Sequence, residues 1–308
     1  MSKWIPERPL YRKERLIAGY PTLAVFALLF LLRMLGRYVP ALSRAAIFRF
    51  FPHLRVFALP IAVFLAVRGS GYLRFMRFNT PRASHLPFLI SSFFVLLCGC
   101  LLLSILCGGM ESLGNSATAY DTAPASRFGE GALAVLSLAI LPAILEEVFF
   151  RGILVAEYER RGGVRAVLMS ALLFALLHFD IHNLAVYLFS GVLFALVLFA
   201  TDSLPATMAL HICYNIVSLF GQRYLNALYA FTGSLELFLF SLILIFLVAL
   251  IFFLKTMSRI YRLREQNGIT EPRRAVPYEV QFYTILDALA DPPILLCIVL
   301  SILGFILL

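Results

Sequence analysis

The fold of this chain is decided by the stretch Ile144-Leu145-Glu146-Glu147-Val148-Phe149-Phe150-Arg151-Gly152, which places three charged residues inside an apolar run. The run begins near Gly131 and continues to about Ala156, and a membrane-spanning helix takes about 20 apolar residues. A charged side chain at the centre of a bilayer costs about 2.5–3.5 kcal/mol on insertion scales. Three of them so close together predict either a functional site or a buried charge network that only locks helix packing.

Helix geometry separates the roles of these three charges, because an α-helix turns by about 100° per residue. Glu147 and Arg151 are four residues apart, so they lie on one face and can form an ion pair. Glu146 points about 100° away from Glu147 and is less well placed to pair with the arginine. The spacing predicts that Glu147 and Arg151 brace the helix, while Glu146 is free for chemistry.

The composition indicates a polytopic helical membrane protein. Of the 308 residues, 61% are hydrophobic and only 14% are charged, and the mean hydropathy is +0.91. These values do not suit a soluble domain. The net charge of +9 comes from basic residues that flank apolar segments, as expected for contacts with anionic lipid headgroups. We therefore expect membrane lipid as a partner and no nucleic acid.

Nine apolar segments are candidate membrane spans. They cover residues 17–36, 54–68, 86–107, 131–157, 165–180, 183–201, 205–221, 234–254 and 285–308. Because the second and the fifth are short, we predict an all-α transmembrane bundle of eight or nine spans. The sequence has no internal repeat and no boundary for a second domain, so residues 1–308 are predicted to form a single integral-membrane domain.

The distribution of basic residues predicts the orientation of the chain. The segments 68–85, 158–165 and 255–274 are rich in Arg and Lys and fall on the side of the N-terminus, which is therefore predicted to be cytoplasmic. The loop 108–130 has three acidic residues, Glu111, Asp121 and Glu130, against Arg127 alone, and falls on the opposite side. Four arginines break this pattern, so either the first hairpin is drawn wrongly or residues 38–53 lie along the interface: Arg37, Arg44, Arg49 and Arg55.

Three more polar residues lie in apolar segments: His178 ends the fifth span, and His211 and Asn215 lie one turn apart in the seventh. Glu146 is about a dozen residues before the turn near 158–164, and His178 is about as many after it. At about 1.5 Å per residue, an antiparallel hairpin brings both to similar depth. A general base, its partner and two hydrogen-bond donors are the parts that peptide hydrolysis without a covalent intermediate needs. Each of these residues alone can equally have a structural role, as a hydrogen-bonding group between helices.

These residues form three ordered motifs: Glu-Glu-x-x-x-Arg (Glu146, Glu147, Arg151), Phe-x-x-x-His (Phe174, His178) and His-x-x-x-Asn (His211, Asn215). From about residue 140 to about residue 220, the chain resembles the CAAX protease and bacteriocin-processing family, whose relatives include the type II CAAX prenyl endopeptidase. The resemblance implies a helical-bundle intramembrane endopeptidase in which the first Glu and the Phe-x-x-x-His histidine activate water. It also implies that the last His and Asn bind the oxyanion and that the catalytic water needs no metal.

The leading hypothesis is therefore an intramembrane glutamic endopeptidase with its catalytic core at about 131–221. Its substrate would be a peptide or protein at the membrane, with a prenylated one among the candidates. A proton- or cation-coupled transporter is an alternative, against which the depth match and the lack of two evident repeats argue. A non-catalytic immunity or scaffold protein that keeps the fold is a third possibility.

No cofactor is expected, and zinc is the second choice. A zinc site needs three or four ligands, for which the candidates are Glu146, His178, His211 and His182. His178 and His182 are four residues apart and can chelate one ion only if the helix continues through Asp180. We expect a short polar turn there instead.

Overall fold

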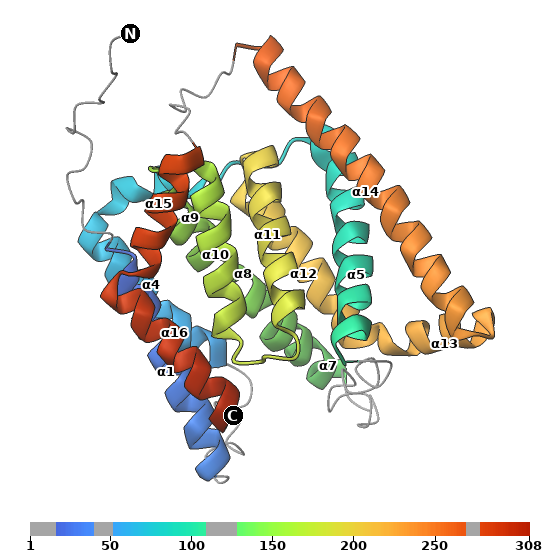
Figure 1. Ribbon diagram of the computed structural model, residues 1–308, viewed down its shortest axis with the longest axis horizontal. Helices are drawn as coiled ribbons and strands as arrows, with labels where there is room; N and C mark the ends of the chain where they lie inside the picture. The colour runs from blue at the N-terminus through green and yellow to red at the C-terminus, as the bar shows by residue number, and fades with distance from the viewer. Residues whose placement is uncertain (1–16, 40–51, 109–127, 269–277) are drawn as a thin grey trace.

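The computed structural model describes residues 17–39, 52–108, 128–268 and 278–308, and every regular element in these ranges is a helix (Figure 1). The longer helices are α1 (Gly19–Tyr38), α4 (Pro52–Arg68), α5 (Leu86–Gly108), α10 (Gly163–Leu177), α11 (Leu184–Thr201), α12 (Leu204–Phe220), α13 (Gln222–Thr232), α14 (Leu235–Gln266), α15 (Tyr278–Leu289) and α16 (Pro292–Leu307). The all-α prediction is confirmed for this part of the chain.

The segment that holds the two glutamates is continuous in direction but is built from five helical pieces. They are α7 (Phe128–Ala134), the π-helical η3 (Val135–Ile140), α8 (Leu141–Glu147), the π-helical η4 (Val148–Leu154) and α9 (Val155–Glu159). Two short 3-10 helices, η1 (Ser70–Met76) and η2 (Ala83–His85), connect α4 to α5.

Among the described residues, five helices are long and apolar enough to cross a membrane: Gly19–Tyr38, Ala83–Gly108, Gly131–Glu159, Leu184–Thr201 and Leu235–Gln266. Two bent pairs raise this to seven if each pair is one span, namely α12 with α13, bent by 68°, and α15 with α16, bent by 69°. Several membrane spans are thus present, while the total of eight or nine and the single domain over residues 1–308 stay predictions.

The structure differs from the predicted spans at two places near the C-terminus. The segment 285–308 is two helices, because α15 ends at Leu289 and Asp291 is the N-cap of α16, which begins with Pro292 and Pro293, where a missing backbone N–H is tolerated. The helix α14 continues to Gln266 rather than ending at residue 254. Lysine and arginine are good helix formers, so the charges that end the apolar stretch do not end the helix.

Two predictions about loops fall mostly outside the described residues. The structure does not describe residues 40–51, which make up most of the proposed interfacial segment 38–53. The same holds for residues 109–127 of the loop 108–130. The orientation of the N-terminus stays a prediction.

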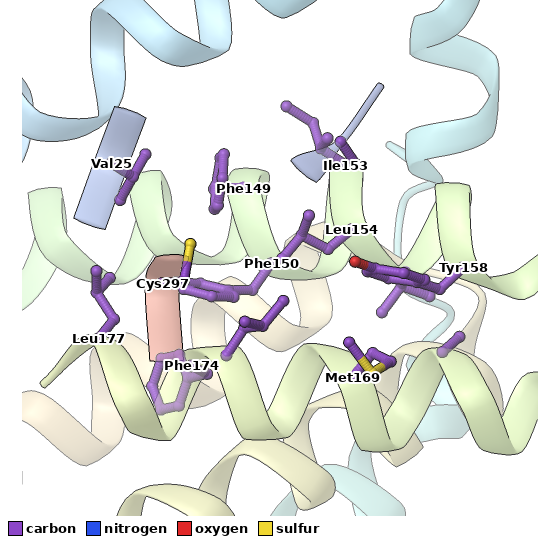
Figure 2. Packing of buried hydrophobic residues seen from close by; sticks show 14 of the residues in the cluster. Val25, Phe149, Phe150, Ile153, Leu154, Tyr158, Met169, Phe174, Leu177 and Cys297 are labelled. Atoms are coloured by element: carbon purple, nitrogen blue, oxygen red, sulfur yellow. The ribbon is translucent and has the colours of Figure 1, made fainter. Parts of the chain in front are cut away.

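The core of the bundle lies where α10 packs against α9, η4 and α11 (Figure 1). Figure 2 shows Phe150, Leu154 and Tyr158 facing Phe174 and Met169 across this contact. The approach of α10 and α11 is close, since a Cβ atom on Gly191 would lie 2.9 Å from the Cα of Ala171. Small residues allow such close packing between membrane helices. The pairs α1–α16 and α5–α14 flank this core.

Candidate active site

The helix carrying Glu146 and Glu147 is interrupted by π-helical turns on both sides of α8. Pro142 lies in the first turn of α8 and has no N–H to donate, so the regular backbone pattern breaks just before it. π-Helical turns inside α-helices occur frequently at functional sites. Here they flank the only adjacent pair of buried carboxylates in the described part of the chain.

Glu146 is buried, with 5% of its surface exposed, and lies near three histidines. Its Oε1 is 3.2 Å from Nε2 of His53 on α4. It also interacts electrostatically with His178, at the end of α10, and with His211, on α12. The structure therefore gathers the predicted Glu146, His178 and His211 in one region and adds a fourth residue, His53, which the sequence did not indicate.

His178 is held in one orientation by two contacts. It caps the C-terminus of α10, and its Nδ1 lies 2.8 Å from the carbonyl oxygen of Phe174. Because a carbonyl only accepts hydrogen bonds, Nδ1 carries the hydrogen, and Nε2 of the neutral ring has a free lone pair. The ring stacks on Tyr187 of α11, with centroids 3.7 Å apart and planes inclined by 15°.

Glu147 is fully buried and accepts hydrogen bonds from two residues at the same oxygen. Its Oε1 is 2.9 Å from a terminal nitrogen of Arg151 and 2.9 Å from Nδ1 of His211. The other terminal nitrogen of Arg151 donates to the carbonyl of Gly191 at 3.0 Å. The predicted Glu147–Arg151 pair is confirmed, and it is part of a larger network that joins α8, η4, α11 and α12.

Aromatic rings surround this buried network. The guanidinium of Arg151 lies 4.6 Å from the ring centroid of Phe174 and 5.1 Å from that of Phe194. Phe194 also stacks on His211, with centroids 4.5 Å apart. Phe174 makes edge contacts with both His178 and His211. The phenylalanine of the Phe-x-x-x-His motif thus packs between the two histidines and supports both.

Asn215 lies one turn beyond His211 on α12, and its side-chain nitrogen donates to the carbonyl of Ala139 in η3 at 3.3 Å. This bond joins the end of the site to the π-helical turn. The second hydrogen of the Asn215 amide is not needed for it. Asn215 is half-buried.

His182 is exposed and lies in a turn rather than on a helix. The carboxylate of Asp180 accepts hydrogen bonds from the backbone of His182 and from Asn183. The expected polar turn is confirmed, and His182 and His178 do not share a helix face. Within the four described ranges, no three His, Cys, Asp or Glu residues lie together so that they could hold a metal ion.

Sequence reasoning missed His53 and Tyr187. His53 lies one residue before the second predicted span, 54–68, at the end of the segment 38–53 for which the sequence left two alternatives open. A histidine beside the start of an apolar segment was the available signal. Tyr187 carries no motif, and only the packing of α11 on α10 shows that its ring covers His178.

The fold and the site together define a multi-pass integral membrane protein in which two buried glutamates lie beside the buried His211 and the half-buried His53 and His178. Residues 128–217 match the family model described as type II CAAX prenyl endopeptidase Rce1-like, which confirms the resemblance seen in the three motifs. The match covers α7 to most of α12 and includes Glu146, His178, His211 and Asn215. Comparisons with curated proteins and with solved structures gave no match. The family supports a CAAX-type membrane protease as the class of this protein.

Proposed function

We propose that the protein is an intramembrane endopeptidase in which Glu146 and His178 activate a water molecule. The observation that carries this proposal is the convergence of Glu146, His178 and His211 from three separate helices within the segment that matches the protease family: Phe174 contacts both histidines, and His211 binds Glu147, the neighbour of Glu146. Burying these groups is costly, so a purely structural role would need a compensating gain.

The first chemical step is attack of water on the carbonyl carbon of the scissile peptide bond. Glu146 takes a proton from the water while the water oxygen bonds to the carbonyl carbon, and the carbonyl oxygen becomes an oxyanion. Nε2 of His178 accepts the second hydrogen bond of the same water, because Nδ1 is already committed to Phe174. Breakdown of the tetrahedral intermediate breaks the C–N bond, and the proton held by Glu146 passes to the leaving nitrogen.

The oxyanion would be stabilised by His211 and Asn215. Nδ1 of His211 is bonded to Glu147, so Nε2 is the nitrogen that remains for the substrate. Donation from Nε2 requires the doubly protonated ring, for which the Glu147 carboxylate is the neighbouring counter-charge. The amide of Asn215 supplies the second donor. Glu147 and Arg151 take no part in the reaction and hold His211 and α11 in place.

The proposed substrate is a peptide or protein at the membrane, with a prenylated C-terminal peptide as the first candidate because of the matched family. The proposed reaction uses only side chains of the protein, and we propose that it needs no metal. The site lies among apolar helices, so a lipid-anchored segment would reach it more readily than a soluble peptide.

The test is cleavage of a fluorescence-quenched farnesylated peptide by the purified protein in lipid nanodiscs. The same peptide without the farnesyl group serves as the comparison for substrate class. The wild type is expected to form product and Glu146→Ala is expected to form none. Equal product from both proteins would end the proposal, and a folded wild type that cleaves neither peptide would favour the transporter or scaffold alternatives.

A further inference from the structure

His53 lies in the first turn of α4, a helix outside the segment 128–217 that matches the protease family. The helix α4 packs against α8, which carries Glu146. Nothing in the three motifs refers to this helix. The contact between His53 and Glu146 therefore joins the matched segment to a part of the chain that the match does not cover.

The imidazole ring of His53 is held in place by an aromatic chain. It lies parallel to the ring of Phe57, one helical turn further along, with centroids 6.3 Å apart and planes inclined by 7°. Phe57 is buried and makes edge contacts with Phe149 and Phe150, which lie two and three residues after Glu147. The position of His53 is thus tied to the same helix segment that carries Glu146.

The hydrogen bond between the two residues has a defined direction. Nε2 of His53 is 3.2 Å from Oε1 of Glu146. The carboxylate only accepts hydrogen bonds, so Nε2 carries the hydrogen and His53 is the donor. The side chain of Glu146 is 7% exposed and that of His53 is 30% exposed, so His53 is on the more open side of the pair.

We infer that His53 is a positioning residue for Glu146: its Nε2–H holds one carboxylate oxygen so that the other is aimed at the catalytic water. The inference rests on the proposed function, because it assigns His53 a role in the orientation of the proposed base. A carboxylate without this bond can rotate about its last side-chain torsion, which is broad. Small errors in the orientation of a catalytic group lower turnover strongly.

The kinetic test uses three substitutions that differ in where they place a donor. The amide nitrogen of His53→Gln reaches about as far as Nε2 of histidine, whereas that of His53→Asn stops near the position of Nδ1. His53→Ala has no donor. The substrate is the quenched farnesylated peptide. We expect His53→Ala and His53→Asn to lower kcat by about 10- to 100-fold while KM changes by less than about twofold. We expect His53→Gln to keep most of the wild-type kcat.

His182→Ala is the matched control, because it removes an exposed histidine in a turn outside the cluster. It is expected to keep the wild-type kcat. A structural role of His53 would lower stability in all three variants without this pattern of rescue. Two results would overturn the inference and leave the proposed function standing. One is an equal loss of kcat in His53→Gln and His53→Asn. The other is a wild-type kcat in His53→Ala while Glu146→Ala is inactive.

A second measurement does not depend on activity. Melting temperatures of Glu146→Ala, His53→Ala and the double variant form a thermodynamic cycle, because each single variant removes one partner of the bond, and a second cycle replaces His53→Ala with His182→Ala. We expect the first cycle to deviate from additivity by about 2 °C or more and the second to be additive. Additivity in the first cycle would overturn the inference. A wild type that cleaves no peptide would end the proposed function and the role of His53 with it, whatever the cycle shows.

Discussion

Nδ1 of His211 lies 2.9 Å from Oε1 of Glu147, although 64 residues separate the two in sequence. The same oxygen binds Arg151, so one buried carboxylate orients both a cation and an imidazole. Its neighbour Glu146 faces the other histidines instead. Two adjacent glutamates on one helix therefore have different surroundings.

Arg151→Ala is predicted to lower stability more than it affects chemistry directly. The substitution leaves Glu147 as a fully buried charge and removes the bond to Gly191. Breaking a buried ion pair by removing one partner costs about 3–5 kcal/mol. Melting in nanodiscs should show a clear loss for Arg151→Ala and almost none for Arg259→Ala, which removes an exposed arginine from α14. Full stability of Arg151→Ala would contradict the role given to Glu147.

Tyr187 is predicted to support catalysis through its stack on His178. Tyr187→Phe keeps the ring and should keep most of kcat. Tyr187→Leu removes the flat surface, lets the imidazole tilt and should lower kcat by about tenfold with little change in KM. The comparison of the two variants on the farnesylated peptide checks this. Equal kcat for both would show that the stack does not position His178.

We predict that catalysis needs no metal ion and that three histidines, His178, His211 and His182, differ in their importance for activity. Activity should persist in protein that elemental analysis shows to be free of bound metal. His178→Ala and His211→Ala should be severe, and His182→Ala should be mild because its side chain is exposed. Stoichiometric zinc, with activity lost on its removal and restored on its return, would replace the glutamate–histidine mechanism with a metalloprotease one.

Local spacing was sufficient to predict the features that lie within one helix or within one helical hairpin. Four residues separate Glu147 from Arg151, and that spacing alone predicted their ion pair. The end of α10 at His178 followed from the polar residues after it. The depth match between Glu146 and His178 needed only the rise per residue and a hairpin.

Contacts between distant helices could not be predicted in this way. The rotation of α12 about its axis decides that Nδ1 of His211 meets Glu147, and packing of many side chains sets that rotation. The π-helical turns beside α8 change the direction in which later side chains point around the helix. A constant rotation of about 100° per residue does not include this change. His53 depends on how α4 meets α8, and no periodicity in either segment specifies it.

The central claim is that Glu146 is the general base, and Glu146→Gln tests it most directly. The amide keeps the shape of the side chain and its place beside His53 but is too weak a base to take a proton from water. We predict that this variant melts within about 2 °C of the wild type and gives no detectable cleavage of the farnesylated peptide. Cleavage by folded Glu146→Gln at the wild-type rate would contradict the account.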